Sequence, residues 1–357
     1  MIVVKLRNIS GGILAREMQE ANHGVQNDTP IFVLSKIVSI ASNRTHGATN
    51  KALGVTFITY GIIVEVLYVI DMFVMCKKKY RQLACYKIMI ALGIYDMASI
   101  SINSLLTGYF WIAGANYCTN PTLIFIAGSF VIGLWCGSCM NCFVLVINRL
   151  LDVWSKIHMK RVFGGYRAYL TLMIPLGYGM YFFLFTQPLF FNSDQAGWYF
   201  YTFTPNHSIE EFLSFPHIAN NLLVVVTTCL LYVQYCRILL RVSKGSTWIS
   251  FAQKSSFFQC TCICMINFAC AMIFVYMEFF QPPACFVYLG HITWQLGNGF
   301  PAFVYILLNR TIQKEVLLLL RFRKPVKPPP TVLVTSSSAN KRTVLIMASS
   351  AAKAFHW

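Results

Sequence analysis

The stretch TLIFIAGSFVIGLWCGSCMNCFVLVI, residues 122–147, decides the fold class of this chain because it runs for 26 residues without a charged side chain. The hydrocarbon core of a bilayer is about 30 Å thick, and a helix needs about 20 mostly apolar residues to cross it. The stretch is therefore predicted to be a transmembrane helix, with Asn148 and Arg149 following at its end.

Six further segments have the length and hydropathy of membrane spans. Hydrophobic residues make up 57% of the sequence and charged residues 11%, whereas soluble domains carry about 25% charged residues. This composition excludes an ordinary cytosolic enzyme and a disordered chain. The predicted spans cover residues 52–76, 84–112, 122–147, 168–191, 215–236, 256–281 and 286–308. We therefore expect an all-α, integral membrane bundle of seven helices.

Basic residues are distributed unequally among the connections between the predicted spans. The formal net charge of +17 fits either a nucleic-acid-binding surface or a membrane protein with sorted charge. Lys and Arg are frequent in 77–82, 148–168, 237–255 and the tail after 309, and they are absent from 113–121, 192–214 and 282–285. Basic residues favour the cytoplasmic side, so the amino terminus is predicted outside. No nucleic acid partner is expected.

The two flanks of the bundle differ from the spans in composition. Residues 1–51 are predicted to be a loosely ordered extracellular segment that precedes the bundle of residues 52–308. In residues 309–322, apolar side chains recur at helical spacing among Lys and Arg. This pattern predicts a short amphipathic helix lying on the anionic inner leaflet of the bilayer. Residues 323–357 are predicted to form a disordered cytoplasmic tail.

Sequons for N-glycosylation offer a second indication of orientation. The N-x-S/T pattern occurs in the predicted outer segments at Asn8, Asn27, Asn43 and Asn206. Asn309 also fits the pattern, but it lies on the predicted inner side and is expected to stay unmodified. The positions of the outer sequons agree with an external amino terminus.

Several blocks of the sequence resemble the nematode serpentine receptors of class T, a family of candidate chemoreceptors. They run in family-like order and spacing over residues 52–320 and include Leu92-Gly93-Ile94-Tyr95-Asp96, Asn103-Ser104, Leu134-Trp135-Cys136, Asn148-Arg149, Trp294-Gln295-Leu296-Gly297 and Tyr305. The resemblance implies a G-protein-coupled receptor for environmental chemicals, with a heterotrimeric G protein and a small-molecule ligand as partners. It further implies the plasma membrane of sensory-neuron cilia, and it does not identify the ligand.

Asn148 and Arg149 are the predicted contact with the G protein. In rhodopsin-like receptors an acidic-Arg-aromatic triplet stands at the end of the third span, whereas here Asn148 replaces the acid and Leu150 the aromatic residue. Either Arg149 holds an inactive state through polar contacts and releases it on activation, or it is a positive-inside anchor. Its place inside a family-matched block favours the signalling role.

Asp96 is predicted near the bilayer centre, where an acid costs about 2.5–3.5 kcal/mol and needs a partner. Ser138 precedes Arg149 by eleven residues, which is almost three turns, so it lies at mid-depth on the same face. Ser138 and Asn298 are the candidate partners of Asp96 in a polar core with a conformational role. Both a bound sodium ion and a protonated acid remain open interpretations.

Three other acids fall within the predicted spans. Glu65, midway along the first span, is expected to be a neutral side chain bonded to a neighbouring helix rather than a ligand contact. Asp71 lies nearer the cytoplasm and is expected to reach water and Lys78. Glu278 lies near the outer end of the sixth span and is the favoured polar contact for a ligand.

The ligand pocket is expected to open outside, between spans three, five, six and seven. Its candidate residues, chosen by depth alone, are Trp135, Asn220, Asn221, Tyr276, Glu278, Tyr288 and Trp294. Cys118 and Cys285, the cysteines of the outer connections, are the candidate pair for a disulfide. The other cysteines, including the repeat of Cys136, Cys139 and Cys142, are predicted to pack between helices, so no metal and no cofactor is expected.

Other functional classes have fewer supporting features. The sequence contains no GxSxG or HExxH motif, and His291 is the only histidine deep in a span, so no enzyme is predicted. A transporter is expected to show paired broken helices or an internal repeat, and neither is evident. A membrane transporter or a ligand-gated channel subunit stays the alternative to the receptor, and a channel would conduct ions without a G protein.

Overall fold

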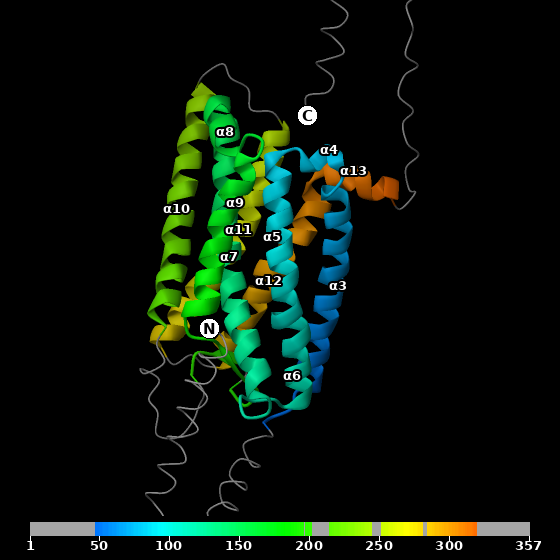
Figure 1. The fold of residues 1–357 in the computed structure, drawn as a ribbon, viewed down its shortest axis with the longest axis vertical. Coiled ribbons are helices and arrows are strands. Elements are labelled where there is room, and N and C mark those ends of the chain that lie inside the picture. The colour runs from blue at the N-terminus through cyan, green and yellow to red at the C-terminus, as the bar shows by residue number, and fades with distance from the viewer. Residues whose placement is uncertain (1–46, 196, 202–213, 245–250, 281–283, 320–357) are drawn as a thin grey trace, which may run out of the picture.

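The protein is a bundle of long helices that run side by side along its longest axis (Figure 1). The computed structural model describes residues 47–195, 197–201, 214–244, 251–280 and 284–319. The long helices are α3 (Lys51–Met75), the continuous α5 (Ala84–Ile100), η1 (Ser101–Leu106) and α6 (Thr107–Ala113), then α7 (Pro121–Trp154), α9 (Arg167–Phe185), α10 (Phe215–Lys244), α11 (Phe251–Phe279) and α12 (Ala284–Leu308).

Short elements mark the two ends of the bundle. At one end lie α4 (Lys78–Arg81), α8 (Lys156–Phe163) and α13 (Arg310–Leu319), and at the other lies the hairpin of β1 (Phe190–Asn192) and β2 (Gly197–Tyr199). We call these the α13 end and the hairpin end. The predicted sequons Asn8, Asn27, Asn43 and Asn206 lie outside the described residues, as do residues 320–357 of the predicted tail.

The all-α transmembrane bundle predicted from the sequence is confirmed. Within the described residues, six helices are long and apolar enough to cross a membrane. α12 is the seventh long helix and is not among these six, and it carries the polar residues His291, Gln295 and Asn298. These three side chains are buried against other helices rather than exposed to lipid. Polar residues on a buried face therefore lower the hydropathy of α12 without preventing it from joining the bundle.

α7 is the central helix of the bundle. Of its most apolar 18-residue window, 83% is buried inside the protein, compared with 22% for α9 and 28% for α3. The helix also continues to Trp154, seven residues beyond the predicted span of residues 122–147. Asn148 and Arg149 lie inside the helix, within its last two turns, and not at its end. Ser155 stops the helix in extended conformation and its hydroxyl accepts from a backbone N–H of α8.

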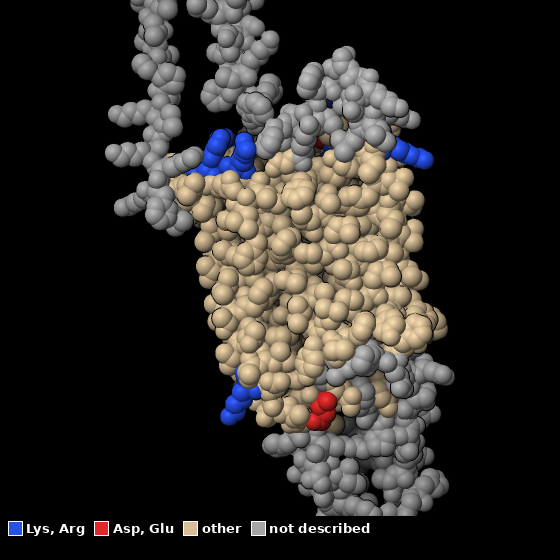
Figure 2. Space-filling model, turned by 180° about the vertical axis from the view of Figure 1, so that it is seen from behind, with Lys and Arg blue, Asp and Glu red and all other residues tan. Residues whose placement is uncertain are grey.

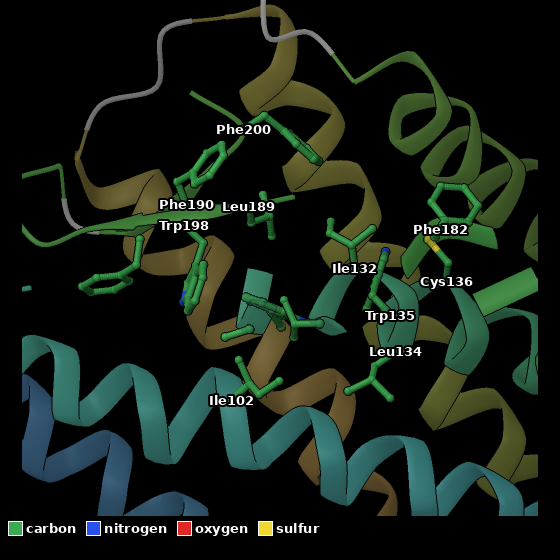
Figure 3. Close-up of a cluster of buried hydrophobic side chains, with 14 of the residues drawn as sticks. Ile102, Ile132, Leu134, Trp135, Cys136, Phe182, Leu189, Phe190, Trp198 and Phe200 are labelled. Atoms are coloured by element: carbon green, nitrogen blue, oxygen red, sulfur yellow. The ribbon is translucent and has the colours of Figure 1, made fainter. Parts of the chain in front are cut away.

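The predicted fourth span, 168–191, extends too far at its carboxyl-terminal end. α9 stops at Phe185, and Phe190–Asn192 pair antiparallel with Gly197–Tyr199. Trp198 points from this hairpin into the bundle (Figure 3) and is 2% exposed. Apolar residues of the hairpin extended the hydropathy signal because they are buried among helices and not in lipid.

Two hydrogen bonds fix the hairpin against the bundle. The indole Nε1 of Trp198 donates to Thr107 Oγ1 at 2.9 Å, and its backbone N–H donates to His291 Nε2 at 3.2 Å. Gly197 stands so close to the His291 ring that a Cβ atom would overlap it. The hairpin therefore bridges α6 and α12 through Trp198.

Glycine allows two pairs of helix backbones to approach closely. A Cβ atom on Gly133 of α7 would lie 2.8 Å from the carbonyl oxygen of Gly179 on α9, and the reverse distance is 2.7 Å. Gly54 of α3 and Gly108 of α6 face each other in the same way, at 2.6 and 2.7 Å. Small residues at such crossings favour helix association in membranes, where apolar burial gives little net driving force.

α13 is attached to the bundle by a cap and an ion pair. Asn309 Oδ1 accepts from the first backbone N–H groups of the helix, which makes Asn309 its N-cap. Glu315 forms an ion pair with Lys77 at 2.7 Å and accepts from Tyr80 Oη at 2.7 Å. The bonds from Lys77 and then Tyr80 hold the pKa of the Glu315 carboxyl below its ordinary value. The buried face of α13 consists of Ile312 and Val316.

The charged side chains are separated along the bundle axis. On the face shown in Figure 2, Lys and Arg gather at the α13 end, and a band without charged side chains lies between the two ends. Lys87 shows how a basic residue near a span end is accommodated. Its Nζ donates to the carbonyl oxygen of Gly165 at 3.0 Å and lies 4.2 Å from the centroid of the Tyr169 ring.

Candidate ligand and coupling sites

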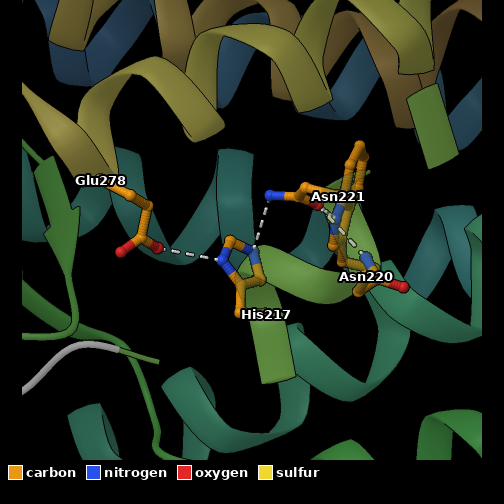
Figure 4. A network of polar contacts seen from close by, with 5 residues as sticks. His217, Asn220, Asn221 and Glu278 are labelled. Atoms are coloured by element: carbon orange, nitrogen blue, oxygen red, sulfur yellow. Dashed lines mark hydrogen bonds and ion pairs between the residues drawn. The ribbon is translucent and has the colours of Figure 1, made fainter. Parts of the chain in front are cut away.

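Polar side chains from four helices meet near the hairpin end, and Figure 4 shows His217, Asn220 and Asn221 of α10 with Glu278 of α11. Asn221 Oδ1 on α10 accepts from Trp135 Nε1 on α7 at 3.0 Å and from Asn220 Nδ2 at 3.2 Å. Asn220 Oδ1 in turn accepts from Tyr178 Oη on α9 at 3.2 Å. Trp135, Asn220 and Asn221 are buried, so these bonds satisfy groups that water does not reach.

The same group of residues continues to α11 through a histidine and a carboxylate. His217 Nε2 lies 3.4 Å from Asn221 Nδ2, and His217 Nδ1 lies 3.1 Å from Glu278 Oε1. We call the six residues of this group the hairpin-end network: Trp135, Tyr178, His217, Asn220, Asn221 and Glu278. It joins α7, α9, α10 and α11 through their side chains.

The direction of each hydrogen bond assigns the protons of this network. An indole N–H can only donate, so the amide oxygen of Asn221 faces Trp135 and its NH₂ group faces His217. Nε2 of His217 then accepts, and Nδ1 carries the proton that it donates to Glu278. A neutral histidine that donates from Nδ1 to a glutamate oxygen therefore satisfies the network. The side chains of His217 and Glu278 remain 6% and 12% exposed.

The other predicted pocket residues lie outside the hairpin-end network. Trp294 is buried on α12 and packs edge-on against Phe274, with ring centroids 6.1 Å apart. Tyr288 stacks on Trp111 at 6.1 Å. Tyr276 is 38% exposed and stands two residues before Glu278, which places it on the opposite side of α11. The structure brings Trp135 and Glu278 into one network and places Tyr276 away from it.

Two members of the network were not among the residues selected from the sequence. His217 and Tyr178 both contribute hydrogen bonds to the asparagines of α10. His217, Asn220 and Asn221 have the i, i+3, i+4 spacing of one helix face. This polar stripe in an otherwise apolar span was the available signal, whereas nothing in the local sequence of α9 distinguishes Tyr178 from the other tyrosines of that helix.

A second polar cluster surrounds Asp96 in the middle of the bundle. Ser138 Oγ donates to Asp96 Oδ1 at 3.2 Å, and Tyr68 Oη lies 2.8 Å from Asp96 Oδ2. Tyr68 Oη also lies 2.6 Å from the backbone oxygen of Asn298. The Asn298 side chain donates to the backbone of Trp294, so Asn298 joins the cluster through its carbonyl group and not through its amide.

The number of protons available to the hydrogen bonds of Tyr68 favours a protonated Asp96. The carbonyl oxygen of Asn298 can only accept, so Tyr68 uses its single proton in that bond. The remaining contact, between Tyr68 Oη and Asp96 Oδ2, then needs its proton from the carboxyl group. Asp96 is 1% exposed, and an uncharged acid is the form that costs least at this depth. Tyr68, which the sequence analysis did not select, is therefore the central hydroxyl of the cluster.

The two acids of α3 are placed differently from each other. Glu65 accepts from Ser101 Oγ at 3.3 Å, which is the bond to a neighbouring helix expected from the sequence. Asp71 is 0% exposed, and neither of its oxygens has a hydrogen-bond partner within the described residues. The prediction that Asp71 reaches water and Lys78 is wrong, because α3 turns this residue toward the bundle.

Arg149 is half-buried near the α13 end and is surrounded by sulfur atoms. Its Nη2 donates to Met89 Sδ of α5 at 3.8 Å, and the guanidinium also contacts the Cys260 thiol of α11. The side chain of Asn148 is buried and donates to Met159 Sδ of α8 at 3.3 Å. None of the salt bridges found in the described part of the chain includes Arg149. Arg149 is thus positioned between two helices by soft sulfur acceptors, and Asp152, one turn later on α7, adds an electrostatic attraction.

Thiol groups form no cross-link at the predicted position. Cys118 and Cys285 are not joined in a disulfide, so the candidate pair is not bonded in this structure. Among the described residues, no three His, Cys, Asp or Glu side chains are arranged to hold a metal ion.

A cavity between α7, α10 and α11 has room for about one water molecule. Its lining consists of Cys139, Cys142, Phe143, Val224, Thr228, Cys264 and Asn267.

The fold defines a multi-pass membrane protein built as a bundle of seven long helices. The sequence profile of the family described as "Serpentine type 7TM GPCR chemoreceptor Srt" matches residues 25–328. The chain belongs to this chemoreceptor family. It is also 28% identical to the Caenorhabditis elegans protein "Serpentine receptor class T-55" over 282 residues, which cover 77% of this chain and 76% of that protein.

Proposed function

We propose that this chain is a G-protein-coupled chemosensory receptor of the plasma membrane, located in sensory-neuron cilia. A small external molecule binds at the hairpin end, and a heterotrimeric G protein binds at the α13 end near Asn148 and Arg149. The hairpin end faces outside in this proposal, which agrees with the concentration of Lys and Arg at the α13 end. The protein acts as a receptor and not as an enzyme.

The observation that carries the proposal is that α7 contributes to both ends. Trp135 belongs to the hairpin-end network, and Arg149 contacts α5 and α11 fourteen residues later, which is about 21 Å along the helix. A ligand that shifts α10 or α11 against Trp135 therefore also shifts the surroundings of Arg149. Between them, Asp96 and Ser138 form the polar core to which we assign a conformational role.

The test of coupling is the substitution Arg149→Ala in a heterologous cell. The receptor is first matched to an agonist by measuring G-protein signalling against an odorant panel. Arg149→Ala should then abolish signalling at normal surface expression, because the α5 and α11 contacts of the guanidinium are lost. Arg161→Ala, an exposed basic residue of α8 at the same end, is the control and should signal normally.

Two results would contradict the proposal. Unchanged signalling by Arg149→Ala would remove this residue from the coupling site. An ion current after reconstitution of the purified chain without any G protein would favour a ligand-gated channel subunit.

A further inference from the structure

We propose that the hairpin-end network recognises a protonated amine, with the Glu278 carboxylate as its counter-ion. The inference rests on the proposed function in one respect, since it names the chemical class of the ligand for that receptor. It depends on the charge, the hydrogen bonds and the aromatic surroundings of Glu278 and His217.

Within the described residues, the ionisable partner of Glu278 is His217, and no Lys or Arg contacts its carboxyl group. Glu278 accepts a hydrogen bond from His217, and the contacts described for it include no Lys or Arg. The bond directions assigned to Asn221 leave His217 neutral, so the histidine satisfies one oxygen without neutralising the charge. A carboxylate that is 12% exposed at the edge of a membrane bundle is strongly stabilised by a cation.

Aromatic rings pack against the histidine that bonds Glu278. The ring of His217 contacts Phe200, with ring centroids 5.0 Å apart, and Phe274, at 6.4 Å. The carboxylate therefore has an aromatic side chain as its hydrogen-bond partner and two further aromatic rings beyond it. Ammonium groups bind favourably where an anion and aromatic faces occur together. A neutral or anionic ligand would gain nothing from the carboxylate.

The sequence at the hairpin end also favours a cation. The connection 192–214 contains Asp194, Glu210 and Glu211 and no Lys or Arg, and the connections 113–121 and 282–285 contain no basic residue. Within these connections acids outnumber bases, and such an excess raises the local concentration of cations and speeds their association. Lys51, at the start of α3, is a described base at the same end. The two carboxylates that the structure describes here have different roles, because Asp194 accepts from the backbone of Ala48 and Glu278 belongs to the network.

Binding to the purified full-length receptor in lipid nanodiscs tests the inference without a G protein. The probes are amines and the alcohols of matching shape: isopentylamine and isopentanol, cyclohexylamine and cyclohexanol, 2-phenylethylamine and 2-phenylethanol. At least one amine should raise the thermal unfolding midpoint of the receptor, and its matched alcohol should not. Stabilisation by alcohols alone, or by none of the amines, would overturn the inference.

Substitutions of single acids test whether the Glu278 carboxylate contributes to amine binding. Glu278→Gln should weaken binding of the active amine at least tenfold, because it removes the charge and keeps the shape. Glu65→Gln, the same change in a span where the acid contacts Ser101, is the matched control and should bind normally. If Glu278→Gln does not fold, Glu278→Asp keeps the charge but withdraws it by one methylene group and should weaken binding of the active amine, and unchanged binding in this variant would also overturn the assignment. Unchanged binding in Glu278→Gln would overturn the assignment.

Signalling separates this inference from the proposed function. A receptor that signals to alcohols or acids and not to amines would contradict the amine site and leave the receptor function intact. Amine binding without G-protein signalling in any cell type would support the site and contradict the proposed function.

Discussion

At the scale of single residues, the two buried polar clusters around Asp96 and Asn221 are held by hydroxyl and amide partners and not by opposite charges. Tyr68 bridges Asp96 to the backbone of Asn298, and Asn221 bridges Trp135 to His217. Such bonds allow an acid at mid-membrane depth to stay in its neutral form. The protonation of Asp96 is the first consequence that can be measured.

The protonated form of Asp96 predicts opposite outcomes for two substitutions. Asp96→Asn keeps a donor to Tyr68 and an acceptor for Ser138, so its thermal stability should stay within about 1 kcal/mol of the original protein. Asp96→Leu removes both groups and should lower stability by about 1–3 kcal/mol. Thermal unfolding in detergent or nanodiscs measures both, and an Asn variant as unstable as the Leu variant would show that the carboxylate is ionised.

At the scale of helices, contacts of backbone against backbone position α7 in the bundle. Gly133 and Gly179 meet without side chains between them, and this fixes the rotation of α7 against α9. That rotation brings Trp135, two residues later, to the asparagines of α10. Tyr178 on α9 stands next to Gly179 and reaches the same asparagines, so the glycine contact and the hairpin-end network depend on each other.

Alanine substitutions at two glycines, one on α7 and one on α9, test this contact. Gly133→Ala places a methyl group 2.8 Å from the Gly179 carbonyl oxygen and should destabilise the bundle by about 1–3 kcal/mol. Gly177→Ala on α9 has no atom within 4 Å of the new methyl group and should stabilise its helix by about 0.5–1 kcal/mol. Thermal unfolding of the two variants should therefore shift in opposite directions, and equal shifts would contradict the packing.

At the scale of the whole molecule, charge and apolar surface are arranged for a membrane with unlike sides. α3 and α9 leave most of their apolar windows unburied, which suits contact with lipid, while α7 is enclosed. The α13 end carries the basic connections and α13 itself, whose apolar face is buried beside the bundle. The orientation that follows from this arrangement is a separate prediction.

Glycosylation in cultured cells tests that orientation. With the hairpin end outside, Asn206 should carry a glycan, and Asn206→Gln should remove a glycosidase-sensitive shift on a gel when the other outer sequons are also replaced. Asn309, the N-cap of α13, should carry none, so Asn309→Ser should leave the gel pattern unchanged. A glycan on Asn309 would reverse the orientation.

The sequence alone determined the class of fold, the number of long helices and the positions of most of their ends. These follow from local properties, since about 20 apolar residues span a bilayer and Asn50, Asn120 and Asn309 cap the helices that follow them. It also indicated Ser138 as a neighbour of Asp96, because helix geometry fixes depth. It could not separate an apolar hairpin from a span, so the fourth helix was predicted too long.

Only the tertiary structure decided which polar side chains meet. Tyr68 and Asn298 are 230 residues apart, and His217 and Glu278 are 61 apart, so their contacts depend on how each helix is rotated and packed. The same rotation buries Asp71, which depth alone placed near water. Hydropathy fixes how deep a residue lies in the membrane, but packing against the neighbouring helices fixes the direction in which it points.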